Sequence, residues 1–419
     1  MSYPGNQVVS WFCLLFLLIL LVGCVQGNGN GNTSSSVGHS SMAVSTPNTP
    51  QTGTRPPFVV SGASVWILFC ADGWEKKKIY QADPYYTDAQ GVKKPKRMYL
   101  YGHFWLQPDT GNLWQYTDNP DVQHCLDEAI TTLHTVYHTT VCGVIGVAEG
   151  KGEWTPADVV SYTKRVVSTP GLLQPIVDQV KAHQYDCLVN DIEDGNAKNP
   201  QIFSTYEHLL KSQLSVPLGQ TLLWKTEAVS GYWQRWEDWQ TLSENADFFI
   251  VMALDHDSIN DQPIPSSVVN LRWVKDIYTY LRSITDMFGK HPIEWELPAY
   301  YRLFVCKEQG VCDSQQGGIW DVSSGTDVEA QIAVALQSNA VAQNYLTDPS
   351  DPYIEYTNAA GKDAYLFIET AESSDTIARA VAQLNGSGCL SLSFWDNDSG
   401  QSLTRGWKGI EGDRAVALC

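Results

Sequence analysis

The 419-residue chain predicts an α/β protein folded as a (β/α)8 TIM barrel. Short apolar runs rich in β-formers alternate with longer amphipathic stretches, as expected when parallel strands are connected by helices. The runs number eight, and 43% hydrophobic residues with 15 Trp supply enough apolar side chains for one large core. In such a barrel the functional side chains lie on the loops that follow the carboxyl ends of the strands.

The first residues predict an export signal. Trp11–Gly23 is an apolar run of 13 residues, too short to cross a ~30 Å hydrocarbon core but typical of a signal-peptide core. It ends in Leu21-Val22-Gly23-Cys24, which resembles the bacterial lipobox, whose cysteine becomes acylated. We therefore expect a lipoprotein signal peptide over 1–24, lipidation at Cys24, and an extracytoplasmic protein anchored by lipid to the bacterial cell membrane. An ordinary secretory signal is the alternative, because Met1–Ser10 has no Lys or Arg.

Residues 25–57 consist mainly of Gly, Asn, Ser, Thr and Pro, with almost no large apolar side chain. Such a segment cannot offset its ordering entropy by burial, so it predicts a flexible tether. The barrel is then expected over 58–419.

Charge and motifs exclude several classes of partner. The formal net charge of −19 argues against binding nucleic acid, whereas a neutral polysaccharide remains an allowed partner. The chain has no CxxC or HExxH motif, so we expect neither a metal nor a cofactor. Cys306 and Cys312 are close enough to clip a loop, whereas Cys142 and Cys187 lie in apolar runs and are expected to be buried thiols.

The eight expected strands share apolar, β-branched or aromatic composition. They are Val65–Cys70, Met98–Trp105, Thr140–Val147, Cys187–Ile192, Gln220–Trp224, Phe248–Ala253, Ile293–Leu297 and Leu390–Trp395.

Amphipathic segments between these runs predict the helices. Thr155-Pro156-Ala157-Asp158 begins one that breaks near Pro170 and resumes to His183, and Val268–Phe288 and Asp375–Leu384 predict two more. Ala71–Arg97 shows no convincing helix.

Residues 303–369 are too many for one loop of the barrel. They predict a small α+β insertion after the seventh strand, with a helix at Val328–Asn344 and strands at Tyr353–Tyr356 and Tyr365–Ile368.

Two carboxylates mark the end of the fourth expected strand. Asp191 and Glu193 are two residues apart, which places both on the same side of a strand and, in a barrel, at the rim of the lumen. Two neighbouring carboxyl groups push their pKa values apart, so that one stays protonated and acts as a general acid. The alternative is a polar strand end that caps the next helix.

The wider pattern resembles glycoside hydrolase family 18, the chitinase-like barrels, whose fourth strand ends Asp-x-x-Asp-x-Asp-x-Glu. Asp186, Asp191 and Glu193 match this pattern, and Val189 takes the second Asp position. Three further stretches are similar to later family motifs in the same order: Met252-Ala253-Leu254-Asp255, Pro298-Ala299-Tyr300-Tyr301-Arg302 and Ser393-Phe394-Trp395-Asp396. The branch that acts on spore or cell-wall glycans is the most similar.

The resemblance implies a glycosidase that hydrolyses β-linked N-acetylated amino-sugar polymers, peptidoglycan or chitin-like, by substrate-assisted retaining catalysis. Glu193 would protonate the glycosidic oxygen, and Asp191 would orient the substrate acetamido group. It also implies that Asp186 supports Asp191 from beneath and that Asp255 binds the acetamido group or tunes Glu193.

The resemblance further implies that Trp395 stacks on the sugar and that Tyr300 and Arg302 belong to the substrate-binding stretch. Trp105 and Trp224 end strands, and both sugar binding and core packing remain open for them.

One departure bears on activity. Leu254 stands where the family has a Tyr whose hydroxyl bonds the acetamido oxygen, and a lost donor at developing charge costs ~3 kcal/mol. Either another hydroxyl compensates, with Tyr300 and Tyr301 as candidates, or turnover is slow. Two alternatives remain: a non-catalytic glycan-binding lipoprotein on the same barrel, and an unrelated barrel hydrolase in which Glu296 or Asp255 is the partner of Glu193.

Overall fold

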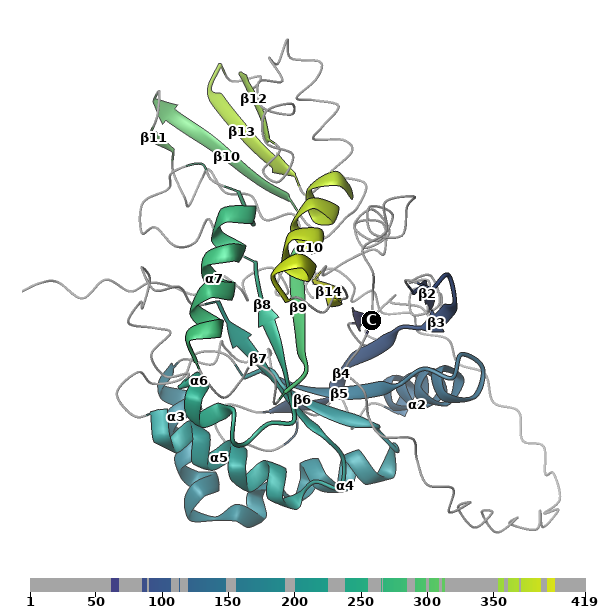
Figure 1. Ribbon diagram of the computed structural model, residues 1–419. Helices are drawn as coiled ribbons and strands as arrows, with labels where there is room; N and C mark the ends of the chain where they lie inside the picture. Colours follow the sequence, from purple (N-terminus) through teal and green to yellow (C-terminus); the bar gives the residue numbers. More distant parts are fainter. Residues whose placement is uncertain are drawn as a thin grey trace, which may run out of the picture. The chain divides into compact units, whose positions relative to one another are not determined.

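The computed structural model of the chain describes most of the predicted barrel (Figure 1). The described residues are 62–67, 85–88, 90–106, 113, 120–147, 156–192, 200–224, 238–254, 265, 267–284, 291–298, 301–308, 311–312, 353–357, 361–368, 371–385 and 390–395. All of them belong to one contact unit, Val59–Ala148 with Trp154–Cys419. The predicted signal peptide with Cys24 and the predicted tether lie outside the described residues.

Eight strands close into a barrel in the order β1-β14-β9-β8-β7-β6-β5-β4, and every neighbouring pair is parallel. The strands are β1 (Ala63–Ile67), β4 (Arg97–Leu106), β5 (Val141–Val147), β6 (Cys187–Asn190), β7 (Leu218–Leu223), β8 (Phe248–Met252), β9 (Ile293–Pro298) and β14 (Ser391–Trp395). Each coincides with one of the eight predicted runs, so the (β/α)8 fold class is confirmed.

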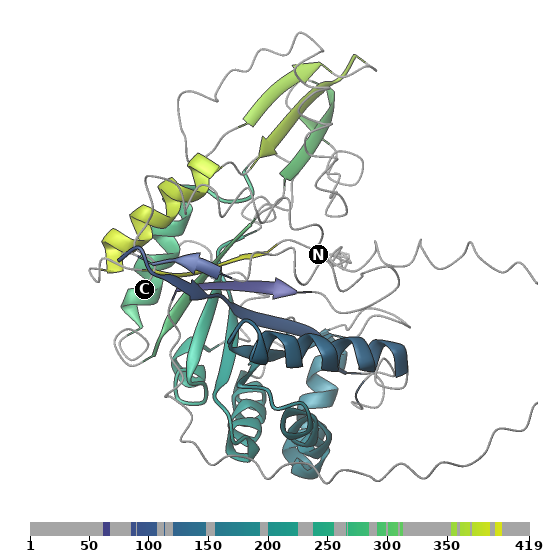
Figure 2. The same ribbon diagram turned by 90° about the vertical axis from the view of Figure 1, so that its right-hand side faces the viewer.

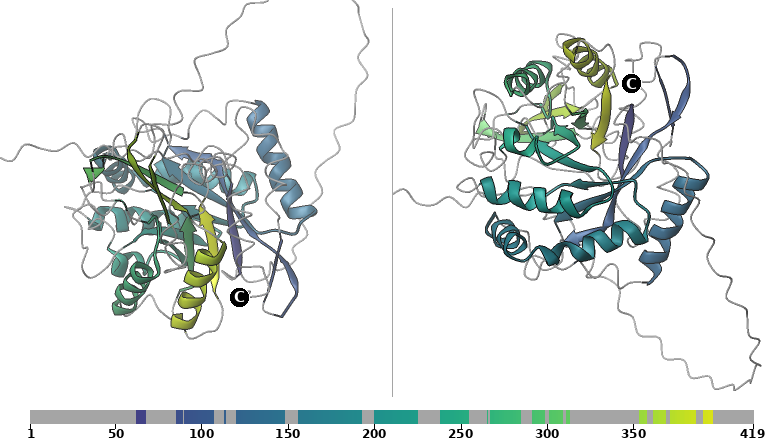
Figure 3. Two further views of the ribbon diagram at one scale, coloured as in Figure 1. Left: turned by 90° about the horizontal axis from the view of Figure 1, so that it is seen from above. Right: turned by 60° about the horizontal axis from the view of Figure 1, so that its bottom comes forward.

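Helices lie outside the ring of strands, as Figures 2 and 3 show. They are α2 (Pro120–Thr135), α3 (Pro156–Ser168), the 3-10 turn η4 (Pro170–Leu173), α4 (Gln174–Ala182), α5 (Pro200–Gln213), α6 (Trp239–Leu242), α7 (Leu271–Ser283) and α10 (Ala371–Asn385). The predicted break near Pro170 is confirmed, because η4 separates α3 from α4. Within the described part of the chain, no helix combines the length and apolar character needed to cross a membrane.

The helix α7 illustrates how sequence produces this layer. The Asn270 side chain accepts a hydrogen bond from the backbone N–H of Trp273 at 2.9 Å, which caps the first turn. Trp273, Ile277 and Leu281 recur every four residues and are buried, so one face of the helix packs on the barrel.

A four-stranded sheet lies between β9 and β14 in the chain. Its order is β11-β10-β13-β12, with β10 (Tyr301–Glu308), β11 (Val311–Cys312), β12 (Tyr353–Thr357) and β13 (Asp363–Ile368). The expected strands at 353–356 and 365–368 are found, whereas β10 was not predicted. The expected helix at Val328–Asn344 lies outside the described residues.

Two further local expectations were tested. Cys306 and Cys312 form the expected disulfide across β10 and β11. Of the stretch Ala71–Arg97, for which no helix was expected, the described residues form the hairpin of β2 (Tyr85–Thr87) and β3 (Lys93–Pro95), and residues 71–84 lie outside the described residues.

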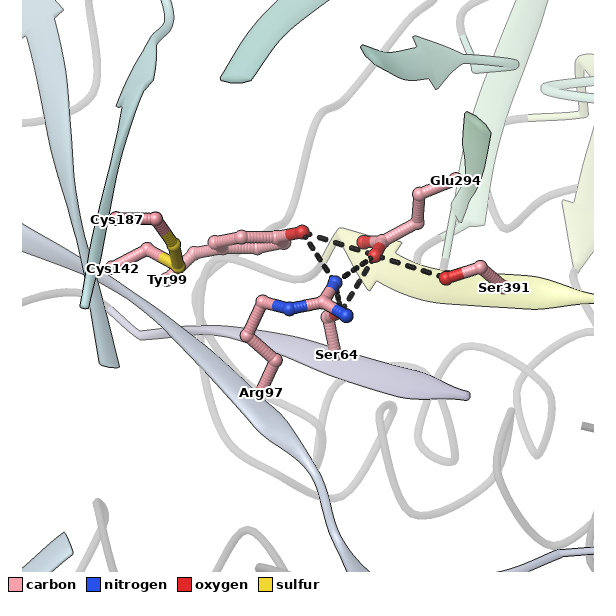
Figure 4. Close-up of polar contacts among 7 residues, drawn as sticks. All are labelled: Ser64, Arg97, Tyr99, Cys142, Cys187, Glu294 and Ser391. Atoms are coloured by element: carbon pink, nitrogen blue, oxygen red, sulfur yellow. Dashed lines mark hydrogen bonds and ion pairs between the residues drawn. A yellow bond between two sulfur atoms is a disulfide. The ribbon is translucent and has the colours of Figure 1, made fainter. Parts of the chain in front are cut away.

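A buried polar cluster fills the lumen near the amino-terminal ends of the strands (Figure 4). Glu294 Oε2 accepts hydrogen bonds from Arg97 Nη1 at 2.6 Å, Ser64 Oγ at 2.7 Å, Tyr99 Oη at 3.0 Å and Ser391 Oγ at 3.3 Å. The side chains of Arg97 and Glu294 are 3% and 0% exposed, so water cannot screen their charges. The cluster therefore ties β1, β4, β9 and β14 together through one carboxylate.

Cys142 and Cys187 form a disulfide between the neighbouring strands β5 and β6. The expectation that they are buried thiols was therefore wrong. The apolar residues next to Cys142 and Cys187 in the sequence correctly predicted that both cysteines are buried. Burial, however, does not distinguish a free thiol from a disulfide. The pairing depends on the parallel register, which places Cys142 directly opposite Cys187 although 45 residues separate them.

Candidate active site

Asp191 lies one residue beyond β6, at the carboxyl-terminal rim of the barrel. The preceding residue, Asn190, faces the helix layer, because it bonds Gln220 Oε1 at 2.8 Å and the Tyr206 hydroxyl of α5 at 3.4 Å. Successive side chains of a strand point to opposite faces, so Asp191 faces the lumen. Its backbone N–H donates to the carbonyl of Ile145 on β5 at 2.9 Å, which fixes the strand end.

The Tyr101 hydroxyl from β4 donates a hydrogen bond to Asp191 Oδ2 at 2.5 Å. The other carboxylate oxygen, Oδ1, is buried and accepts no hydrogen bond from the described residues. Burial raises the pKa of Asp191 to about 6, and the Tyr101 and Thr221 hydroxyls partly counter this rise by favouring the ionised form. The site thus presents a carboxyl group that titrates near neutral pH and has one oxygen available.

The raised pKa of Asp191 makes a prediction about stability. In the unfolded chain Asp191 ionises near pH 3.8, and in the fold near pH 6, so the fold holds the proton more tightly. The protonated state therefore contributes stability that is lost as pH rises from about 4 to about 6. Replacing Asp191 by Asn should raise the free energy of unfolding at pH 8, by up to about 3 kcal/mol, and leave it nearly unchanged at pH 3.5.

Urea unfolding of the wild type and Asp191→Asn at these two pH values measures the difference. Asn retains an oxygen that can accept from Tyr101, so the substitution removes the charge with little change of shape. Equal stability differences at both pH values would contradict the raised pKa.

Asp186 occupies the opposite end of β6. Its Oδ2 accepts from the backbone N–H of Val141 at the start of β5 and lies 2.9 Å from Nε2 of His134, which is near the end of α2. The prediction that Asp186 supports Asp191 from beneath is therefore wrong. The whole strand Cys187–Asn190 separates the two carboxylates, and Asp186 connects the amino-terminal ends of β5 and β6 to α2 instead.

Trp224 follows β7 and is 2% exposed. Its ring packs edge-on against Trp273 of α7, with the ring centroids 5.3 Å apart. A ring buried between strand and helix cannot stack on a sugar, so the predicted role of Trp224 in substrate binding is corrected to core packing. Trp239, at the start of α6, is also buried.

Several predicted site residues cannot be placed by their side chains. Glu193, Asp255 and Tyr300 lie outside the described residues. Trp105, Arg302 and Trp395 belong to β4, β10 and β14, but only their backbones are described. The backbone of Trp395 pairs with Pro298 at the carboxyl end of β14, the same rim as Asp191.

The two departures from the family pattern are both described. Val189 is fully buried in β6 and, two residues before Asp191, faces the lumen. Leu254 lies two residues beyond β8 and is 8% exposed. Neither side chain can donate or accept a hydrogen bond. Val189 and Leu254 therefore contribute only apolar surface near Asp191 and at the end of β8.

Tyr101 is the residue of this site that sequence reasoning missed. Arg97, Tyr99 and Tyr101 alternate along one side of β4, and this polar row at period two was a usable signal. Tyrosines in strands commonly pack in cores, however, and nothing local shows that the hydroxyl reaches a residue 90 positions away.

Comparison with known proteins agrees on the fold. No family model matches the sequence, and no curated relative matches it. The chitinase of Chromobacterium violaceum ATCC 12472 superposes with a TM-score of 0.60 at 16% identity, over 84% of this chain and 99% of that one. The spore cortex-lytic enzyme SleL of Bacillus megaterium QM B1551 gives 0.60 at 16% identity, over 83% and 73%.

A plant class V chitinase mutant from Cycas revoluta, in complex with (GlcNAc)3, gives a TM-score of 0.57 at 10% identity, over 83% of this chain and 98% of that chain. These identities are too low to transfer activity. The chain shares the closed eight-stranded barrel of chitinases and of a spore cortex-lytic enzyme.

Proposed function

We propose that this protein is a glycosidase that hydrolyses β-linked N-acetylated amino-sugar polymers, such as peptidoglycan or chitin-like chains. The observation that carries the proposal is Asp191, which faces the lumen at the carboxyl rim of a chitinase-like barrel, with one oxygen bonded to Tyr101 and the other available. Glu193 follows Asp191 two residues later in the sequence, and we propose it as the second carboxyl group of the site.

In this mechanism Glu193 protonates the glycosidic oxygen, and the leaving sugar departs with that proton. The substrate's own acetamido carbonyl oxygen attacks the anomeric carbon, and water later opens the resulting ring with retention. Asp191 accepts the acetamido N–H through Oδ1 and, when ionised, balances the positive charge that develops on the ring. Asp255 is proposed to bind the acetamido group, and Trp395 to stack on the sugar.

Replacing Glu193 by Gln should lower the release of reducing ends by about 10²- to 10⁴-fold, because Gln cannot donate the proton. The assay compares wild type and Glu193→Gln, expressed without the residues before Phe58, on N-acetylglucosamine oligomers and on peptidoglycan. The control is Glu244→Gln, which removes an exposed carboxylate from the turn before β8 and should leave turnover unchanged.

A non-catalytic glycan-binding protein is the second candidate, and Leu254 favours it. This side chain offers no hydroxyl to the acetamido oxygen at the end of β8. Binding of both glycans without release of reducing ends by wild type would support the binder and reject the glycosidase.

We also propose that the protein is exported and anchored to the bacterial membrane through lipid on Cys24. The proposal rests on the apolar run ending in Leu21-Val22-Gly23-Cys24. Metabolic labelling with a tagged fatty acid should label the wild type but not Cys24→Ser.

A further inference from the structure

We infer that Tyr101 is a positioning residue that holds Asp191 for the reaction, in the place of the acidic partner that Val189 does not supply. The inference rests on the proposed function and adds a residue of β4 to a site otherwise predicted from β6, β8 and β14. Four features of the described residues carry it.

The first feature is the contact itself. The Tyr101 hydroxyl donates to Asp191 Oδ2 at 2.5 Å, and Tyr101 is 5% exposed. A donor to a carboxylate in a water-poor site forms a strong hydrogen bond. Because Tyr101 occupies Oδ2, we infer that Oδ1, which is buried and accepts no hydrogen bond from the described residues, is the oxygen that accepts a substrate N–H.

The second feature is the chemistry of the neighbouring position. Val189 lies on the same side of β6 as Asp191 and has no polar atom. A carboxylic acid at that position would share a proton with Asp191 and lose its donor when ionised. A phenol, with an ordinary pKa near 10, keeps its proton through the pH range in which Asp191 ionises and so remains a hydrogen-bond donor there.

The third feature is the irregular pairing of β4. Leu100 pairs with Gly143 on β5, and the next pair is Phe104 with Ile145, so four steps along β4 match two along β5. The surplus residues between these pairs form a bulge that contains Tyr101. Tyr101 continues the alternation of Arg97 and Tyr99, so it faces the lumen at the step where the regular pairing ends, and there its hydroxyl reaches Asp191.

The fourth feature is the packing on both sides of the bulge. The Tyr101 ring lies 5.7 Å from Trp66 of β1, centroid to centroid. Beyond the bulge, the Phe104 ring packs directly on Gly143. A Cβ atom at position 143 would lie only 2.2 Å from this ring, so only glycine leaves room for it. The Tyr101 side chain is therefore supported by the Trp66 ring on one side and by Asp191 at its hydroxyl, with no substrate bound.

Two hydroxyl groups of the described residues act on the carboxyl group of Asp191. Among the described residues, its pKa responds to burial and to the hydroxyls of Tyr101 on β4 and Thr221 on β7. Glu193, two residues further along the chain, is the titratable group that the proposed function adds to this site. Removing the Tyr101 hydroxyl therefore acts on Asp191 directly.

The test uses Tyr101→Phe in the full chain, with Tyr99→Phe as the matched control. Tyr99 is the previous lumen-facing tyrosine of the same strand, and its hydroxyl bonds Arg97 and Glu294 instead. We expect Tyr101→Phe to lower kcat about 10- to 100-fold, as loss of a hydrogen bond to a charged group implies, and to move the acid limb of the pH–rate profile upward. Tyr99→Phe should lower stability and leave the acid limb where it is in the wild type.

A second measurement does not depend on turnover. The unfolding equilibrium of wild type, Tyr101→Phe, Asp191→Leu and the double variant gives the coupling between the two side chains, because Leu is similar in shape to Asp and accepts no hydrogen bond. At pH 8, where Asp191 is ionised, we expect the effect of Tyr101→Phe on the unfolding equilibrium constant to be about tenfold or more larger when Asp191 is present than when it is replaced. At pH 4 this ratio should be smaller. A coupling near zero at pH 8, or an unmoved acid limb, would overturn the role of Tyr101.

The two proposals fail in different ways. If wild type binds glycan but does not cleave it, the glycosidase is rejected, and the coupling at pH 8 still decides whether Tyr101 holds Asp191. If wild type cleaves glycan and Tyr101→Phe keeps the wild-type pH profile, the glycosidase stands and the inference about Tyr101 is wrong.

Discussion

Replacing Arg97 by Met should lower the free energy of unfolding by about 3–5 kcal/mol, because it leaves the carboxylate of Glu294 buried without its cation. Arg97 Nη1 lies 2.6 Å from Glu294 Oε2 (Figure 4), and neither side chain is open to water. The Ser64, Tyr99 and Ser391 hydroxyls also donate to this oxygen, but they carry no charge to balance it. The measurement is the urea midpoint at pH 7.

The double variant Arg97→Met with Glu294→Gln should regain much of that loss, because a neutral amide still accepts from the three hydroxyls and no buried charge remains. Lys211→Met is the control. Lys211 lies 3.0 Å from Asp247 in a partly exposed pair and should contribute at most about 1 kcal/mol. A loss for Arg97→Met no larger than that of Lys211→Met would contradict the interpretation of the cluster as a buried charge pair.

Removing the Cys142–Cys187 disulfide by changing both residues to Ala should lower the free energy of unfolding by about 4 kcal/mol. The bond closes a loop with a sequence separation of 45, which restricts the unfolded chain far more than the folded one. It also joins β5 to β6, the strand that leads to Asp191. Chemical denaturation of wild type and the double variant under oxidising conditions measures the effect.

The disulfide of Cys306 with Cys312 provides an internal comparison. Its sequence separation is 6, so the same entropy argument assigns it only about 2 kcal/mol. If the Cys306→Ala, Cys312→Ala variant loses as much stability as the Cys142→Ala, Cys187→Ala variant, loop length does not account for the difference. A reductant should lower the stability of each double variant only by the contribution of the disulfide that it retains, and that of the wild type by the contributions of both.

The barrel could be predicted from local patterns along the chain. All eight strands were predicted, because parallel strands buried on both faces appear as short, nearly continuous apolar runs. Helix starts such as Pro156 and the break before Pro170 were also local, since they depend on caps and on proline geometry. The position of Asp191 at a strand end followed from the same counting.

Tertiary structure alone decided which side chains meet. Asp186 matched a motif by spacing, yet the length of β6 carries it to the opposite rim, where it bonds His134. Trp224 ended a strand as predicted, but alternation turned its ring outward onto α7.

The hydrogen bond of Asp191 depended on how β4 and β6 lie in the closed barrel, and the disulfide of Cys142 depended on the register between β5 and β6. Periodicity along the chain is set by local backbone geometry, which neighbouring residues reveal. Contact across a barrel is set by register and by strand-end geometry, which residues far apart in the chain determine together. The sequence therefore specified the scaffold and the rim, and the closed fold specified that Tyr101 bonds Asp191.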